Sequence, residues 1–276
     1  MGVSRQNGLT NTTKQMSLRD QLRERYGKEH LSYSSLKHAL GDMRYFDMYM
    51  RGEIKKTSDA LHFGNVYDCL LLTPSEFEKS YAVIDEAYLL SQCSSATKMG
   101  SRPKATKEFK SLLEQMKDTV EQEGMIPVMQ DDYAKAQQMI ERLDQEGLLD
   151  SVLSGGEAQV MFNEDVDGVP LKGFIDYLHV DFVLDSKSSR AMDKFKYDVR
   201  SFCYDIQAYI YTLVTGKKEF YWLVQEKNDP YYPGLVTCSE KTLFDGEMKF
   251  SEALENIKEW LSTDESEQDG FARFTV

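Results

Sequence analysis

The sequence has no apolar run long enough to cross a membrane, since a spanning helix needs roughly 20 apolar residues in succession. The polar N-terminus, from Met1 to Lys14, also has no apolar core of the kind found in signal peptides. These two absences argue against a membrane protein and against export. We therefore expect a soluble protein that stays inside the cell.

Cysteine is scarce and scattered. The four cysteines, Cys69, Cys93, Cys203 and Cys238, lie far apart and form no C-x-x-C pair. This spacing argues against a zinc site, a redox motif and an iron–sulfur cluster, all of which need several thiolates at one point. The chain also has no glycine-rich loop typical of nucleotide binding, so a phosphohydrolase acting on small substrates is the weakest functional hypothesis.

Positive charge is in short supply. The chain has 33 Lys and Arg against 46 Asp and Glu, a formal net charge of −13, which is unfavourable for contacts with phosphate groups. Two segments depart from this average: one contains Lys98, Arg102, Lys104, Lys107 and Lys110, the other Lys187, Arg190, Lys194, Lys196 and Arg200. Either segment could line a nucleic-acid channel, and the alternative is an ordinary solvated surface.

The chain is long enough for one large domain. With 276 residues, of which 41% are hydrophobic, it can bury a sizeable core without being divided. We expect a flexible tail at residues 1–16, because this stretch is polar and has no apolar periodicity. A single domain then covers residues 17–276, with a mainly helical part at 17–150, a core at 151–240 and a C-terminal helix at 241–262.

The spacing of apolar residues predicts the order of elements. Ser32 or Ser34 can cap a helical segment that runs to about Met50, and residues 66–72 form a predicted helix that Pro74 ends. Residues 105–150 have helical spacing. The period then changes to two, which predicts strands around 160–162, at 169–178 and at 182–187, followed by a helix at 202–214 and a strand at 220–225. This order is typical of an α/β fold.

Two aspartates interrupt the predicted strands. Asp176 lies in Gly-Phe-Ile-Asp-Tyr-Leu (173–178), and Asp185 lies in Val-Leu-Asp-Ser-Lys (183–187). If these strands are neighbours, the two carboxylates approach each other, and Lys187 points to the same face as Asp185. Converging carboxylates can hold Mg²⁺, which shields phosphate and activates water. Lys187 could position or deprotonate that water or neutralise charge on the phosphate, although a lone Asp-x-Lys is also common on surfaces.

The ordered set Phe-Ile-Asp176-Tyr-Leu and Leu-Asp185-Ser-Lys187 resembles the core of PD-(D/E)XK nucleases, in which an aspartate precedes a strand that carries D/E-x-K. Other segments are similar to the branch of RecE-like and lambda-exonuclease-like phage-type exodeoxyribonucleases. They are residues 31–37 (Leu-Ser-Tyr-Ser-Ser-Leu-Lys), Phe63-Gly64 through Pro74, Glu157 ahead of the hairpin, the helix with Gln207 and Tyr211, and residues 225–231. The resemblance spans about residues 31–235.

This resemblance implies a restriction-endonuclease-like core, with a central mixed β-sheet flanked by helices and an N-terminal helical extension. The implied ligands of Mg²⁺, for which Mn²⁺ is expected to substitute, are Asp176, Asp185, Glu157, Ser186 and Asp68. The implied catalytic residues are Lys187, Asp176, Asp185, Glu157, Gln207 and Tyr211. The alternatives are a helix-end carboxylate for Glu157 and ordinary packing for Gln207 and Tyr211.

The resemblance also implies an activity: a magnesium-dependent DNA exonuclease that resects double-stranded ends in recombination or phage DNA metabolism. Its location would be the cytoplasm of a bacterium or of a phage-infected host cell. The implied partners are double-stranded DNA ends, a single-strand annealing protein, and further copies of the chain in a cyclic trimer or tetramer. Such a ring would gather the basic segments around one axis, so the expected DNA contacts are Lys98, Arg102, Lys104, Arg190 and Lys194.

One position departs from the family pattern. The family usually has histidine four residues after the glycine, and this chain has Asp68 there. A carboxylate can bind the hard Mg²⁺ ion at least as well as an imidazole, but Asp68 could instead only pair within a helical core. Asp68 and the net charge therefore support an alternative hypothesis, a non-catalytic DNA-binding or assembly protein on the same fold.

Overall fold

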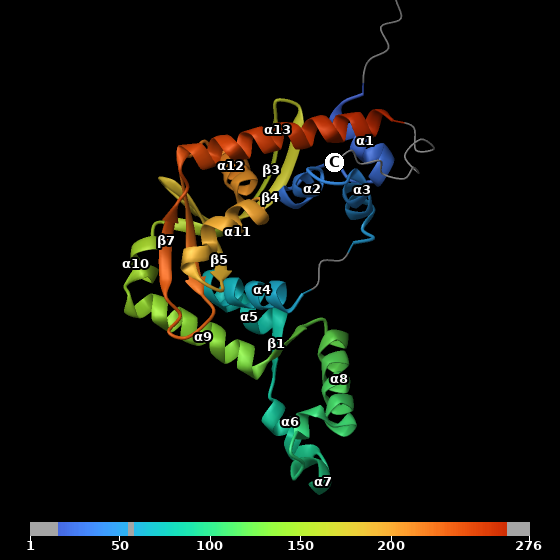
Figure 1. Cartoon of the computed structure of the whole chain (residues 1–276), viewed down its shortest axis with the longest axis vertical. Coiled ribbons are helices and arrows are strands. Elements are labelled where there is room, and N and C mark those ends of the chain that lie inside the picture. Colours follow the sequence, from blue (N-terminus) through green and yellow to red (C-terminus); the bar gives the residue numbers. More distant parts are fainter. Residues whose placement is uncertain (1–15, 55–57, 264–276) are drawn as a thin grey trace, which may run out of the picture.

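A five-stranded mixed sheet, in the order β3-β4-β5-β6-β7, forms the centre of the fold (Figure 1). The computed structural model describes residues 16–54 and 58–263, so the tail predicted at 1–16 lies almost wholly outside the described residues. The strands are β3 (Gly156–Val166), β4 (Val169–His179), β5 (Phe182–Ser189), β6 (Glu219–Glu226) and β7 (Pro233–Thr237). The predicted α/β fold with a mixed central sheet is confirmed.

The connections between the strands determine how the strands pair. β3 and β4 form an antiparallel hairpin around Asp167 and Gly168, whose φ angles of 51° and 81° match a type I′ turn. β5 and β6 are parallel, and parallel neighbours need a crossover, which α11 (Phe195–Ser201) and α12 (Tyr204–Thr215) provide. β7 pairs antiparallel with β6. The crossover between the neighbouring strands β5 and β6 therefore places α12 against one face of the sheet.

Two hydrophobic cores cover the two faces of the sheet. The first, called the α12 core, also contains residues of α11, α1 (Leu18–Tyr26), α2 (Tyr33–His38), α3 (Met43–Arg51) and α13 (Glu240–Ser262). The second, called the α4 core, contains residues of α4 (Asp59–Leu72), α5 (Pro74–Ser80), α9 (Gln130–Gln145) and α10 (Leu148–Val152). Among the described residues, no helix has both the length and the apolar character needed to cross a membrane.

The segment from Ser32 to Met50 forms two helices, where the apolar spacing had suggested one. Ser32 caps α2 as predicted, but the chain then turns through Gly41. Asp42 starts the next helix, because its carboxylate accepts a hydrogen bond from the backbone N–H of Arg44 at 3.0 Å. The apolar period alone does not reveal this break.

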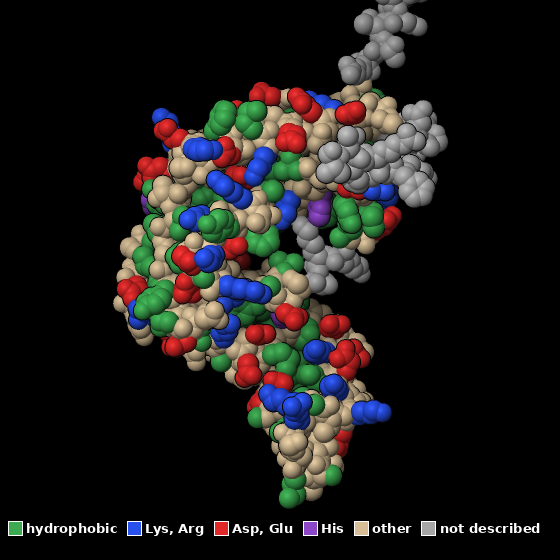
Figure 2. Space-filling view, in the orientation of Figure 1, with side chains coloured by type: hydrophobic (Ala, Val, Ile, Leu, Met, Phe, Trp, Pro, Cys, Tyr) green, Lys and Arg blue, Asp and Glu red, His purple; other side chains and the backbone are tan. Residues whose placement is uncertain are grey.

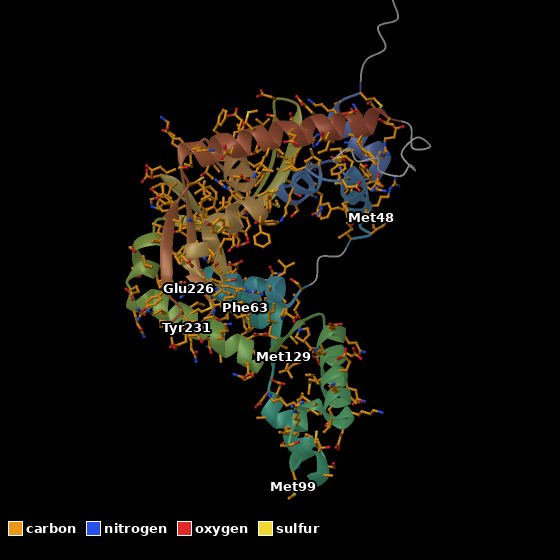
Figure 3. All side chains as sticks on the ribbon, viewed as in Figure 1. Met48, Phe63, Met99, Met129, Glu226 and Tyr231 are labelled. Atoms are coloured by element: carbon orange, nitrogen blue, oxygen red, sulfur yellow. The ribbon has the colours of Figure 1, made fainter. Side chains whose placement is uncertain are left out.

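An arm projects from the α4 core, away from the sheet (Figure 1). Its elements are β1 (Tyr81–Ile84), α6 (Glu86–Gln92), α7 (Ser95–Lys98), η1 (Pro103–Ala105), α8 (Lys107–Gln122) and β2 (Ile126–Met129). The arm has a small core of its own, and Met99 lies near its tip (Figure 3). The helical spacing predicted within residues 105–150 corresponds to α8 and α9, and β2, which pairs in parallel with β1, lies between these two helices. A strand of four residues is too short to show a period.

Gly246 allows α13 to pack closely on the start of α12. A Cβ atom at this position would lie 2.2 Å from the carbonyl oxygen of Asp205, and no side-chain rotation can relieve a contact with backbone. We expect Gly246→Ala to lower the free energy of unfolding by about 2 kcal/mol, because overpacking outweighs the gain of up to about 1 kcal/mol in helix propensity. The quantity to measure is the midpoint of urea unfolding.

Gly64, inside α4, provides the matched control for this prediction. A Cβ atom there would meet nothing within 4 Å, so Gly64→Ala is expected to stabilise the protein by about 0.5–1 kcal/mol. Equal effects of the two substitutions would show that helix propensity, rather than packing, decides the outcome at position 246.

Candidate active site

The sheet forks between β4 and β5. These strands pair over only two residue pairs, Tyr177 with Leu184 and Leu178 with Val183, and the ladder then stops. Just beyond the last pair, the carboxylate of Asp176 accepts a hydrogen bond from the backbone N–H of Ser186 at 2.9 Å. A side chain thus takes the place of the next backbone acceptor. The fork places Asp176 beside the β5 segment that carries Asp185.

The strand β3 is irregular at Gln159, which lies opposite Asp176 in the hairpin. Ala158 packs in the α4 core and Val160 in the α12 core, although residues two apart on a regular strand share a face. Between them Gln159 has a φ of 53°, a left-handed conformation that costs a non-glycine residue about 1–2 kcal/mol. Its side-chain amide lies 3.4 Å from Asp176 Oδ1. Local strain of this kind is often found at functional sites, and the alternation pattern did not indicate it.

Asp185 and Lys187 form a buried ion pair. The carboxylate of Asp185 is fully buried, and the side chain of Lys187 is 17% exposed. Gln207 Nε2 donates to Asp185 Oδ1 at 2.8 Å and lies 3.2 Å from the hydroxyl of Tyr211. Lys187 Nζ also donates to the carbonyl of Ser186 at 3.2 Å and lies 4.9 Å from the ring centre of Tyr204. The structure therefore brings the predicted strand residues and the predicted α12 residues together.

Asp68 reaches the same point from α4. Burial raises its pKa well above the usual value, and the Asp176 carboxylate raises it further, while Lys187 and the Ser186 side chain act in the opposite direction. Burial likewise raises the pKa of Asp185 to about 7, with Lys187 opposing and Asp176 adding to the shift. Burial lowers the pKa of Lys187, but the carboxylates of Asp185 and Asp176 more than compensate and hold it above its ordinary value. Three carboxylates thus share one cation.

This set of donors fits a divalent metal ion in its chemistry. Carboxylate oxygens and the Ser186 carbonyl are the hard ligands that Mg²⁺ prefers, and a divalent cation would offset the mutual repulsion of the carboxylates. Asp185 Oδ2 is buried, with the Lys187 ammonium as its ionic partner. Among the described residues, no group of three or more acidic, histidine or cysteine side chains is placed so that it could hold a metal ion by itself, so the backbone and water would have to complete the site. Mg²⁺ tolerates such an open site because it usually keeps several of its waters.

Tyr33 is a site residue that sequence reasoning missed. Leu31 forms a parallel bridge to Leu171, on the edge of β4 that β5 has left free, with two backbone hydrogen bonds of 2.8 Å. This bridge carries Tyr33 to the mouth of the fork, where its hydroxyl donates to the carbonyl of Phe202. Burial raises the pKa of Tyr33, and the nearby Lys187 ammonium acts in the opposite direction. The sequence showed Tyr33 only as the residue after a helix cap.

The chain matches the family described as a PDDEXK-like domain of unknown function (DUF3799) over residues 32–270. It belongs to this family. The DUF3799 match covers the fork and all the helices that contribute side chains to it, so the predicted resemblance to PD-(D/E)XK proteins is confirmed. None of the curated proteins matches the chain in sequence.

Two solved structures are similar to this DUF3799 protein. One, from Eubacterium rectale, is described as a putative exonuclease: it is 16% identical, with a TM-score of 0.53 over 99% of this chain and 97% of that one. The other, an alkaline exonuclease from Laribacter hongkongensis, is 11% identical, with a TM-score of 0.29 over 68% of this chain and 94% of that one. At these identities the first match shows a shared fold.

Other residues predicted for the DUF3799 site lie apart from the carboxylates. Glu157 is exposed and pairs in register with Leu178; within the described part of the chain it shows no contact with Asp176 or Asp185. Lys98, Arg102 and Lys104 lie on the arm, where Lys104 pairs with Glu86 at 3.0 Å. Arg190 and Lys194 follow directly after β5, on the side where the fork opens. The two basic segments therefore occupy separate places in one chain.

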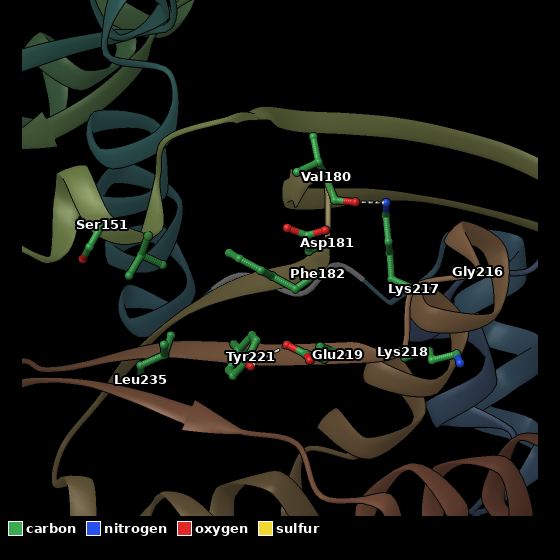
Figure 4. Close-up of a pocket in the computed structure, with 11 residues that line it drawn as sticks. Ser151, Val180, Asp181, Phe182, Gly216, Lys217, Lys218, Glu219, Tyr221 and Leu235 are labelled. Carbon is green, nitrogen blue, oxygen red and sulfur yellow. Dashed lines mark hydrogen bonds between the residues drawn. The ribbon is translucent and has the colours of Figure 1, made fainter.

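The surface is hollowed between α2 and α3 on one side and α4 and α5 on the other, and Lys and Arg side chains border this hollow (Figure 2). A different cavity, of 740 Å³, lies where β5 and β6 begin. Its lining includes Asp181, Phe182, Lys217 and Tyr221 (Figure 4). Because Phe182 begins β5 and Lys187 lies near its end, this cavity is separate from the site at the fork.

Proposed function

We propose that this protein is a divalent-metal-dependent deoxyribonuclease, and that it acts as an exonuclease on double-stranded DNA ends in recombination or phage DNA metabolism. The observation that carries the proposal is the convergence of Asp176, Asp185 and Lys187 at the fork, in the order and on the fold of the PD-(D/E)XK family. The similarity to a structure described as a putative exonuclease supports the proposal of an exonuclease rather than an endonuclease.

Mg²⁺ or Mn²⁺, when bound, would shield the phosphate and activate a water for attack on phosphorus. Asp176, Asp185, Asp68 and the Ser186 carbonyl are the groups that would hold the ion, and Gln207 keeps the Asp185 carboxylate in place through its 2.8 Å hydrogen bond. The raised pKa of Lys187 favours a protonated ammonium, which suits charge neutralisation at the phosphate better than proton abstraction. The ring of Tyr204, whose centre lies 4.9 Å from Lys187 Nζ, covers part of this ammonium.

Incubating end-labelled linear duplex and closed circular duplex with the protein tests the proposal. With Mg²⁺, progressive loss of the linear duplex and survival of the circle is the expected result, and chelator should stop the reaction. Cleavage of both substrates would indicate an endonuclease. Binding without cleavage of either would favour the alternative that Asp68 and the net charge of −13 support, a DNA-binding or assembly protein.

Asp68→Asn tests whether the unusual carboxylate takes part in metal binding. The substitution keeps the size of the side chain and removes one negative charge, so we expect weaker binding of Mg²⁺ by about 10-fold or more, with a parallel loss of cleavage at low Mg²⁺. Titration calorimetry with Mn²⁺ and with Mg²⁺ measures the affinity. Glu157→Gln, at the exposed position, should change metal affinity much less.

Wild-type metal affinity in Asp68→Asn would mean that Asp68 only packs within the α4 core. Asp68→His would install the residue usual in the family, and its affinity for Mn²⁺ should then exceed that for Mg²⁺ more than in the wild type, because imidazole is the softer ligand.

We also propose that the chain assembles into a cyclic trimer or tetramer, with a single-strand annealing protein as a further partner. The arm supports this proposal, because it holds Lys98, Arg102 and Lys104 away from the fork in one chain, where a neighbour could bring them to its own DNA path. Light scattering at micromolar concentration, with and without DNA, measures the assembly. A mass of 31.8 kDa in both cases would contradict it.

A further inference from the structure

The outer half of the β3–β4 hairpin exposes an apolar pair next to the fork. Met161 and Phe174 are partners in the antiparallel register, and they are 68% and 55% exposed. Their chain neighbours Phe162 and Ile175 point into the α12 core, so Met161 and Phe174 point to the opposite side of the sheet. An exposed aromatic ring beside a methionine offers a surface on which a flat apolar or aromatic group can stack.

The position of this pair indicates what the partner is. Phe174 lies two residues before Asp176 on β4, an advance of about 7 Å, which is the scale of one nucleotide in an unstacked strand. The next register pair on the same face outward is Asn163 with Lys172, and Lys172 is exposed. Going outward from the fork, a carboxylate, an aromatic ring and a cation thus occur at every second residue of β4, although the alternation of faces breaks at Asp176, because Ile175 packs in the α12 core and Tyr177 in the α4 core. A strand held by its phosphate at the fork would place a base over Phe174, and the phosphate two nucleotides along would lie near Lys172.

We propose that Met161 and Phe174 form a stacking platform for one nucleobase of the strand whose phosphate lies at the fork. This inference rests on the proposed nuclease function and adds to it a base-binding position next to the scissile phosphate. Stacking on an aromatic ring accepts any base, because every base has a π face. The platform therefore adds binding affinity and fixes the position of the DNA strand relative to the fork, without a preference for sequence.

The test combines Phe174→Ala with DNA that lacks a single base. Duplexes with a short single-stranded end carry an abasic site at successive positions, and their dissociation constants are measured by fluorescence anisotropy at fixed salt. Phe174→Ala is expected to weaken binding of intact DNA by about 5- to 100-fold. At one abasic position the wild type should lose the same factor, and Phe174→Ala should lose nothing further there. Phe174→Tyr should restore binding.

Phe244→Ala is the matched control, since Phe244 is 58% exposed on α13 and should leave binding unchanged. The proposal is overturned if Phe174→Ala binds as tightly as the wild type, or if its loss is the same at every abasic position. It is also overturned if Phe174→Ala changes the mass measured by light scattering, because the pair would then be a contact between copies of the chain. Intact stacking without Mg²⁺-dependent cleavage would contradict the nuclease function alone.

Discussion

Asp185→Asn is expected to lower the rate of DNA cleavage by at least about 10²- to 10³-fold, because the substitution removes a charge that acts directly on the reacting centre. The asparagine keeps the shape of the side chain and an oxygen that can accept the hydrogen bond from Gln207. Single-turnover cleavage of labelled linear duplex at saturating Mg²⁺ measures the chemical step. Asp181→Asn is a suitable control, since the Asp181 side chain is 79% exposed and lies just before β5, at the end of the strand away from the fork.

The choice of asparagine follows from burial. Substitution of Lys187 would leave the Asp185 carboxylate buried without its cation, which typically costs about 3–5 kcal/mol of stability, so loss of activity would be confused with loss of fold. Asp185→Asn instead removes the repulsion among the carboxylates. Near-normal turnover in this variant, with a normal unfolding curve, would be incompatible with a metal site at the fork.

The stability of the metal-free protein should fall as the pH rises from about 4 to about 7. The pKa of Asp185 is raised from 3.8 to about 7 in the folded chain, so over this range the folded state keeps a proton that the unfolded state has released. Because a tenfold change in acidity corresponds to about 1.4 kcal/mol, the loss could reach about 4 kcal/mol, and it is complete above pH 7. The raised pKa of Asp68 acts in the same direction.

Thermal unfolding in the presence of chelator, between pH 4 and pH 8, measures this effect. Partly exposed carboxylates whose pKa is lowered by arginine, such as Glu29 and Asp42, add stability to the protein as the pH rises through about 4. The comparison must therefore be with Asp185→Asn, which keeps these carboxylates, rather than with a pH-independent stability. The wild type should lose stability relative to this variant as the pH rises. Mg²⁺ should restore the stability of the wild type at pH 7.5 and have little effect on it at pH 5. Parallel curves for the two proteins would contradict the buried charge cluster.

Residues that a strand or helix positions through its own periodicity could be predicted from the sequence. Asp185 and Lys187 are two apart on β5, so their shared face follows from alternation once the strand is recognised, and Gln207 and Tyr211 are one turn apart on α12 for the same reason. The turn at Asp167 and Gly168 likewise fixed the hairpin. Local chemistry was sufficient in each case.

Residues that depend on long-range contacts could not be predicted. Tyr33 reaches the site only because Leu31 bridges to Leu171 far along the chain, and Gln159 contacts Asp176 only because its backbone departs from strand geometry. The basic segment at 98–110 lies on an arm whose base is the β1–β2 pair, and its own sequence did not indicate this placement. The spacing of apolar residues does not predict these positions, because they depend on contacts between segments that lie far apart in the sequence.

The hydrogen bond from the Ser186 backbone to Asp176 also gives the protein a natural spectroscopic reporter. Most backbone N–H groups of a sheet are bonded to carbonyl groups, but this one is bonded to a carboxylate that would also be a metal ligand. Its nitrogen and proton chemical shifts should therefore respond to charge on Asp176 far more than those of Leu184, which lies in the regular ladder. A single amide resonance could thus follow occupation of the fork in solution, without substrate and without turnover.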